Sequence, residues 1–163
     1  MMRILFLDFD GVLHPVPGVP TDRVLRGKPV VRAGHGLPFE WLPILCGLLR
    51  PHPDVRIIVH SSWRLVHAAT DVREMLGELA DRFVACAPHG PRWDCVRAVL
   101  DTNTDITDYC ILDDAAEELA SAPSGRVILC DPYIGISDPR VQRRLQAWLA
   151  GPAGALADRT SAA

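Results

Sequence analysis

The chain opens with MMRILFLDFDGVL (residues 1–13), in which four apolar residues (4–7) lead directly into Asp8 and Asp10. A continuous apolar run is typical of a strand that is covered on both faces, as in a parallel sheet. Side chains repeat every two residues in extended backbone, so we expect both carboxylates to point the same way. Two like charges so placed repel each other unless a cation or a proton lies between them, and Gly11 after them permits a sharp turn. The beginning of the sequence therefore predicts a buried strand that ends at an acidic site.

The rest of the chain alternates short apolar runs with segments of helical periodicity. Strands are predicted over residues 55–59, 83–86, 109–112 and 127–130. Helices are predicted over about 40–50, over 72–79, around 96–100 and from residue 139 onward, where Asp138 is the expected N-cap. This alternation predicts an α/β fold, a mostly parallel Rossmann-like sheet with helices on both faces. Ligands of such sheets bind beyond the carboxyl ends of the strands, so the residues there are the candidates for function.

The composition favours one soluble globular domain. Of the 163 residues, 48% are hydrophobic and 23% are charged, and the net charge of −3 argues against a protein that coats nucleic acid through a basic surface. The five cysteines include no C-x-x-C pair, which favours free thiols in a reducing compartment over disulfides or a zinc site. No apolar run approaches the roughly 20 residues that span a bilayer, and the first run is too short for a signal peptide. We therefore expect a cytoplasmic protein with no membrane partner.

Residues 14–38 differ from the rest of the chain, because they contain five of its 14 prolines. This segment is long enough for a hairpin flap and too short for a folded cap domain. Residues 20–36 include four basic side chains and one acidic side chain. This excess of positive charge would suit a polyanionic substrate with a terminal phosphate. A solvated hairpin without a ligand is the open alternative. We expect residues 1–150 to form the domain and the Ala/Gly-rich residues 151–163 to be a disordered tail.

Two more predicted strands end in polar residues. Ser61 follows the strand over 55–59, and Asp113 and Asp114 follow the strand over 109–112. Carboxylates that converge on one sheet edge form a hard-oxygen site of the kind that Mg²⁺ takes, usually together with waters and a substrate phosphate. The Ser61 hydroxyl and nearby backbone N–H groups would suit a phosphoryl oxygen. The alternatives are that Ser61 only forms a turn and that Asp114 caps a short helix over 115–120.

The order of these features resembles the motifs of the haloacid dehalogenase (HAD) superfamily. The resemblance rests on LDFDGVL (residues 7–13), followed by a serine after the next strand and by LDD (residues 112–114), all at strand ends. The segments IVHSSWR (residues 58–64) and GIS (residues 135–137) resemble a narrower group more closely, the small HAD domains related to those of multidomain Swiss Army Knife RNA-repair proteins. The resemblance covers roughly residues 3–150.

The resemblance implies phosphoryl transfer through an aspartyl-phosphate. Asp8 would be the nucleophile, and Asp10 would protonate the leaving oxygen and later deprotonate the attacking water. Mg²⁺ would be held by Asp8, the backbone carbonyl of Asp10 and Asp113, with Asp114 in a water-mediated contact. Ser61 would donate a hydrogen bond to the transferring group.

The family's usual lysine before its last motif is missing, because Lys28 is the only lysine and lies far upstream. Arg92 is the expected replacement, since arginine supplies a positive charge and bidentate contacts to phosphate. Arg64 and Arg97 are the alternatives. The predicted substrate contacts are Ser61, Ser62, Arg92 and Lys28.

These residues predict a Mg²⁺-dependent phosphomonoester hydrolase, with terminal phosphates of nucleic acids or nucleotides as the candidate substrates. The first alternative is a HAD fold with weak activity that serves as a binding or regulatory module, or as a partner-dependent subunit of a nucleic-acid repair system. A cysteine phosphatase would use the C-x₅-R spacing of Cys86 and Arg92, but Pro88 and Pro91 remove two of the N–H groups that such a loop needs. A receiver domain would carry its acceptor aspartate on a middle strand and a lysine later in the chain, and neither feature is present.

Overall fold

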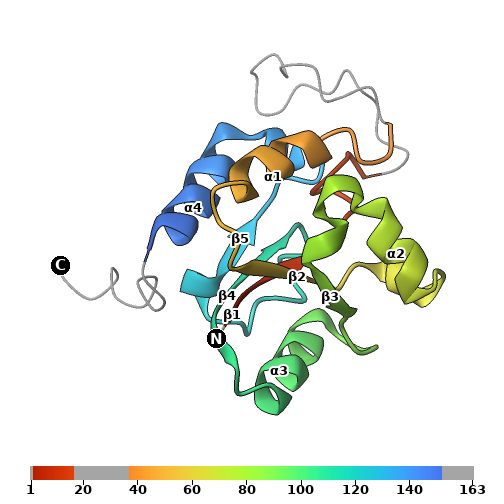
Figure 1. Cartoon of the computed structure of the whole chain (residues 1–163), viewed down its shortest axis with the longest axis vertical. Helices are drawn as coiled ribbons and strands as arrows, with labels where there is room; N and C mark the ends of the chain where they lie inside the picture. Colours follow the sequence, from red (N-terminus) through yellow and green to blue (C-terminus); the bar gives the residue numbers. More distant parts are fainter. Residues whose placement is uncertain (1, 17–36, 152–163) are drawn as a thin grey trace.

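A computed structural model describes residues 2–16 and 37–151 of the chain. Most of the predicted flap, Lys28 and nearly all of the predicted tail therefore lie outside the described residues. The described part forms one parallel sheet with helices on both of its faces (Figure 1). No helix of this part is both long and apolar enough to cross a bilayer.

The sheet has the strand order β3-β2-β1-β4-β5, and every neighbouring pair is parallel. Its strands are β1 (Met2–Leu7), β2 (Val55–Val59), β3 (Phe83–Cys86), β4 (Ile106–Asp113) and β5 (Val127–Leu129). The first strand of the chain lies in the centre, which explains why its four apolar residues are fully buried. Leu7 is in register with Val59 on one side and with Leu112 on the other. The residues that follow these three positions consequently leave the sheet at the same edge.

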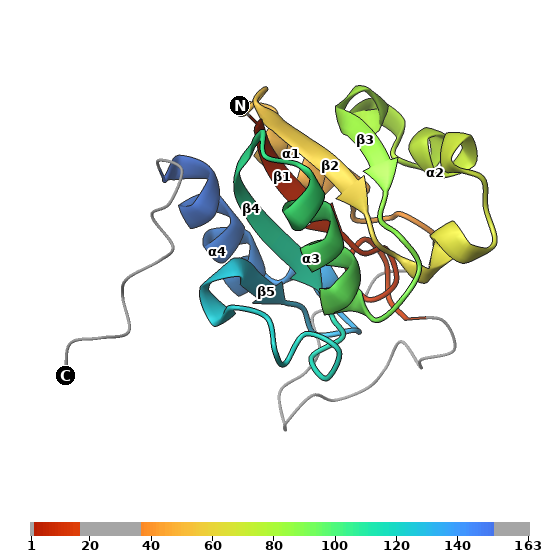
Figure 2. The same ribbon diagram turned by 90° about the horizontal axis from the view of Figure 1, so that it is seen from below.

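Helices cover both faces of the sheet (Figures 1 and 2). α1 (Leu42–Leu49), α2 (Ala69–Met75) and α4 (Pro139–Ala150) pack on one face, and α3 (Arg92–Thr102) packs on the other. Alternate residues of β1 divide between the two cores: Leu5 and Leu7 join the first, and Ile4 and Phe6 join the second. Short 3₁₀ helices occupy Ser62–Leu65 (η1), Gly77–Arg82 (η2), Ser124–Arg126 (η3) and Gly135–Ser137 (η4).

The predicted helix over 72–79 is broken. α2 ends at Met75, and Gly77 has a φ of +51°, a left-handed conformation that interrupts an α-helix and starts η2. Leu79 remains buried on this second, tighter turn, so the apolar spacing of the segment is satisfied by two short helices instead of one.

The helix expected over 115–120 is also absent, because these residues form turns. The side chain that accepts a backbone hydrogen bond there is Asp113, from the N–H of Ala115 at 2.8 Å, and Asp114 caps no helix. By contrast, α4 begins as predicted: Asp138 accepts from the N–H of Arg140 at 2.8 Å, and proline occupies the first helical position.

Candidate active site

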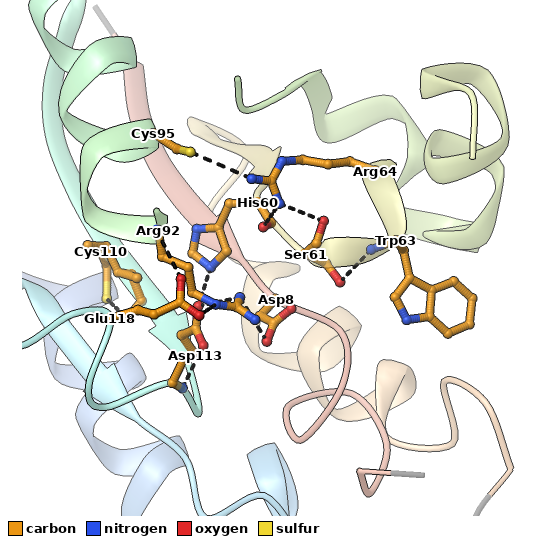
Figure 3. A network of polar contacts seen from close by, with 12 residues as sticks. Asp8, His60, Ser61, Trp63, Arg64, Arg92, Cys95, Cys110, Asp113 and Glu118 are labelled. Carbon is orange, nitrogen blue, oxygen red and sulfur yellow. Dashed lines mark hydrogen bonds and ion pairs between the residues drawn. The ribbon is translucent and has the colours of Figure 1, made fainter. Parts of the chain in front are cut away.

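Three carboxylates meet at the edge where β1 and β4 end. Asp8, Asp113 and Asp114 each place one oxygen within 4.8 Å of the others. The side chains of Asp8 and Asp113 are buried, and Figure 3 shows these two side chains close together. Gly11 makes room for this group, because it has a φ of +71° and a Cβ on it would lie 2.7 Å from Cγ of Asp114. The acidic residues lie close together because β1 and β4 are parallel neighbours, and their carboxyl ends lie at the same edge of the sheet.

Arg92 is the first residue of α3, and its side chain reaches the three carboxylates from the face of the sheet that α3 covers. Its Nη1 lies 3.1 Å from Oδ2 of Asp8 and 2.8 Å from Oδ2 of Asp113. Its backbone N–H donates to Oε2 of Glu118 at 3.2 Å, and its Nε lies 3.6 Å from Oε1 of the same residue (Figure 3). The guanidinium is therefore held against two buried carboxylates by the start of α3 and by an acidic side chain.

The two alternative arginines make other contacts. The guanidinium of Arg64 donates to the carbonyl oxygens of His60, Ser61, Ala87 and Pro88, so it joins the loop after β2 to the loop after β3. Arg97 is exposed and pairs with Asp94 at 3.0 Å. The geometry favours Arg92 among the three, and its role in phosphate binding stays a prediction.

His60 is a part of the site that the sequence analysis missed. It follows β2 directly, and its backbone N–H donates to the carbonyl of Leu7 at 3.1 Å, which continues the register of β1 and β2. Its fully buried ring stacks on Phe6, and its Nε2 lies 2.6 Å from Oδ2 of Asp113. The available signal was its position: it is a polar residue at the end of a buried strand next to β1.

Burial and the repulsion between like charges act on the pKa values of these carboxyl groups. Burial raises the pKa of Asp8, and Asp113 raises it further, against the opposing charge of Arg92. Burial also raises the pKa of Asp114, to about 7, with further contributions from Asp8 and Asp113. Burial acts in the same direction on Asp113, but the contact with His60 and the charges of His60 and Arg92 outweigh it and hold the pKa of Asp113 below its ordinary value.

The residues present fit a divalent cation. Both carboxylate oxygens of Asp8 are buried, and the ion pair of Oδ2 with Nη1 of Arg92 at 3.1 Å leaves Asp8 with lone pairs that can bind a metal ion beside two further carboxylates. Hard oxygen donors of this kind and the accumulated negative charge are what Mg²⁺ requires. Asp113 has less free capacity, because Ala115 and Arg92 each donate to one of its oxygens.

Asp10 lies outside the three-carboxylate group. Its Oδ1 is 2.8 Å from Nε2 of His14, and its Oδ2 accepts from the indole N–H of Trp63 at 3.0 Å. The sequence analysis assigned no function to His14 or to Trp63. The backbone carbonyl of Asp10 stays a predicted metal ligand.

The predicted substrate-binding residues Ser61 and Ser62 lie in different environments. Ser61 is fully buried, and its Oγ accepts from the N–H of Trp63 at 3.4 Å at the start of η1, so the turn-forming role considered for it is present. Ser62 is exposed, and Lys28 lies outside the described residues. Partial burial raises the pKa of the Cys86 thiol, which disfavours the reactive thiolate that a cysteine phosphatase would need.

Comparison with known proteins identifies the family of the chain. A family model described as the HAD domain in Swiss Army Knife RNA repair proteins matches residues 4–141, from β1 into α4. Searches of curated proteins and of solved structures gave no match. The resemblance that the motifs predicted is confirmed, and the chain belongs to the family of HAD domains found in Swiss Army Knife RNA repair proteins.

Proposed function

We propose that this HAD domain is a Mg²⁺-dependent phosphomonoester hydrolase that acts through an aspartyl-phosphate on Asp8. The observation that carries the proposal is the environment of Asp8: a buried carboxylate at the end of the central strand, whose Oδ2 lies 3.1 Å from Nη1 of Arg92 and whose Oδ1 has no side-chain partner among the described residues. A carboxylate in this environment has the free electron pairs of a nucleophile and a fixed positive charge beside it for the incoming phosphate.

In the first step, a carboxylate oxygen of Asp8 attacks phosphorus and the bond from phosphorus to the leaving alcohol breaks. Asp10 transfers its proton to the leaving oxygen. In the second step, water attacks phosphorus, Asp10 takes a proton from that water, and the bond between phosphorus and Asp8 breaks, which releases inorganic phosphate. Arg92 donates to the phosphoryl oxygens in both steps.

Asp8 and Asp113 would hold the metal ion, with Asp114 close enough to bind it directly or through water. When bound there, Mg²⁺ would offset negative charge on the transferring phosphoryl group. This group of carboxylates supports the assignment: burial raises the pKa of Asp114 and the negative charges of Asp8 and Asp113 raise it further, a repulsion that a bound cation would relieve.

A terminal phosphate on a nucleic acid or nucleotide is the proposed substrate class. Its support is the RNA-repair setting in which domains of this family occur and the excess of basic residues between positions 20 and 36 of the sequence. A positively charged segment adds affinity for a polyanion through contacts to its phosphates.

The test is phosphate release from oligonucleotides with 3′- or 5′-phosphate ends and from small sugar phosphates, with Mg²⁺ and with EDTA. Asp8→Asn is the matched control, because it keeps the shape of the side chain and removes the nucleophile. We expect release from oligonucleotides that requires Mg²⁺ and Asp8. Release confined to sugar phosphates would contradict the substrate class. Oligonucleotide binding without Asp8-dependent release from any phosphomonoester would instead support a binding module.

A further inference from the structure

We propose that His14 and Trp63 are positioning residues that orient the carboxylate of Asp10 for proton transfer, an inference that rests on the proposed function. Each contacts a different oxygen of that carboxylate, and they come from different parts of the chain: His14 from the loop after β1, and Trp63 from η1 after β2. A carboxylate held through both oxygens has a fixed plane as well as a fixed position.

The direction of the His14 contact follows from its second ring nitrogen. Nδ1 of His14 accepts from the backbone N–H of Phe39 at 3.1 Å, so a neutral ring carries its proton on Nε2. That Nε2–H donates to Oδ1 of Asp10 at 2.8 Å. Phe39 has a φ of +59°, which few residues other than glycine adopt, and this conformation accompanies its hydrogen bond to the histidine.

The direction of the Trp63 contact is unambiguous, because an indole N–H is only a donor. The ring is fixed by its neighbours: it meets Phe39 edge to face at 5.3 Å between centroids and Phe9 at 6.0 Å, and His67 stacks on it at 5.5 Å. Since His67 stacks on the indole and the two phenylalanine rings pack against it, Trp63 is poorly placed to stack a nucleobase. Its indole N–H is instead committed to Oδ2 of Asp10.

The side chains of Asp10 and His14 differ in exposure. The side chain of Asp10 is 28% exposed, whereas that of His14 is 5% exposed. Asp10 can therefore meet a substrate, and His14 acts only through Asp10. A carboxylate has about four lone-pair sites, so two remain for the leaving oxygen or the attacking water after both donors are bound.

The test compares two substrates whose leaving groups differ in their need for a proton. p-Nitrophenolate departs as a stable anion, whereas the alkoxide of an alkyl phosphate must be protonated as it leaves. The measured quantity is kcat/KM in the presence of Mg²⁺, which covers steps only through departure of the leaving group and so excludes the later water attack. The variants are Trp63→Phe and His14→Phe, which keep a ring and remove the donor, with Asp10→Asn as the reference for complete loss of the acid.

Misplacement of a reacting group by about 1 Å lowers rates by roughly 100-fold, so we expect kcat/KM for the alkyl phosphate to fall by roughly 10- to 100-fold in Trp63→Phe and His14→Phe. The loss on p-nitrophenyl phosphate should be several-fold smaller, and Asp10→Asn should show the same selectivity in stronger form. His14→Gln, whose amide can still donate, should recover part of the loss. His67→Phe is the matched control, because His67 contacts Trp63 and no contact joins it to Asp10 among the described residues; its substrate ratio should equal that of the wild type.

The ratio of the two substrates is measured within each variant, so a change in folded fraction cancels. Equal losses on both substrates, or no loss, in an active protein would overturn the positioning role and leave the proposed function intact. A wild-type protein that releases phosphate from neither substrate nor from the oligonucleotides would overturn the proposed function, and this inference with it.

Discussion

Replacing Arg92 with methionine should destabilise the metal-free protein and enlarge its stabilisation by Mg²⁺. The substitution keeps much of the length of the side chain and removes the positive charge that lies 3.1 Å from Asp8 and 2.8 Å from Asp113. Both carboxylates are buried, so water cannot replace the lost counter-ion. A divalent cation bound by the same oxygens can replace it, and it no longer meets the repulsion of a neighbouring guanidinium.

The size of the effect follows from the burial of the pair. Breaking a buried ion pair by removing one partner destabilises a protein by roughly 3–5 kcal/mol. The raised pKa of Asp8 lets this carboxyl take up a proton and relieve part of the loss, so we expect the lower end, about 3 kcal/mol. In a domain of this size 1 kcal/mol shifts Tm by about 2–4 °C, which gives a fall of roughly 6–12 °C in EDTA. Mg²⁺ at 100 times its Kd adds about 2.7 kcal/mol to the wild type, and the gain in the variant should be larger.

The assay is thermal unfolding of each protein in EDTA and across a Mg²⁺ titration. Arg97→Met is the matched control on the same helix, because Arg97 is exposed and its ion pair among the described residues is with an exposed aspartate. Its free energy of unfolding should stay within a few tenths of a kcal/mol of the wild type. Arg64→Met should lower Tm with no change in the Mg²⁺ increment, since the carbonyl oxygens of His60, Ala87 and Pro88 lose the guanidinium that donates to them. An equal Mg²⁺ increment in Arg92→Met and the wild type would refute the reasoning.

Three further outcomes are expected. Gly11→Ala should weaken Mg²⁺ binding, measured by calorimetry, because the new Cβ collides with Asp114 and the positive φ strains the backbone; unchanged affinity would contradict the proposed metal site. Asp138→Ala should reduce stability in urea by about 1 kcal/mol at pH 7. The contact with Arg140 lowers the pKa of Asp138, so this difference should shrink as pH falls below about 4; a difference independent of pH would argue against it. Burial raises the pKa of Cys110 to about 12, so a thiol reagent at pH 8 should modify it only after unfolding, as peptide mapping can show.

The fold was predictable because its decisive signals are local. Four apolar residues before Asp8 predict a strand buried on both faces, and Asp138 followed by proline predicts the start of a helix; the structure confirms both. The break in α2 was missed because the apolar spacing through Leu79 fits a helix, and only the left-handed backbone at Gly77 ends it. Hydrophobic periodicity indicates which side chains are buried, but it does not indicate a local change of backbone conformation of this kind.

The candidate site was predictable only in part. The structure brings Asp8, Asp113, Asp114 and Arg92 together, and their chemical roles stay predictions. His60 and Trp63 were missed because each contacts an aspartate 53 positions away in the sequence, and no spacing rule connects such residues. His14 was missed although it lies only four positions after Asp10, because the loop that brings the two side chains together has no periodicity. An isolated histidine or tryptophan in a sequence fits a core position equally well, so only the folded arrangement distinguishes a donor to a functional carboxylate from a packed ring.

The hydrogen bond from Phe39 to His14 has a consequence for the basic segment of the chain. Together with the bond from the N–H of Trp41 to the carbonyl of Leu13, at 2.9 Å, it joins the two sides of the interval that contains residues 17–36. These two hydrogen bonds hold the two ends of the interval together next to Asp10, whatever the sequence between them. Doubling the length of a closed loop costs only about 0.6 kcal/mol. The interval between these two ends can therefore vary in length and in charge at little cost in stability, while Asp10 keeps its place.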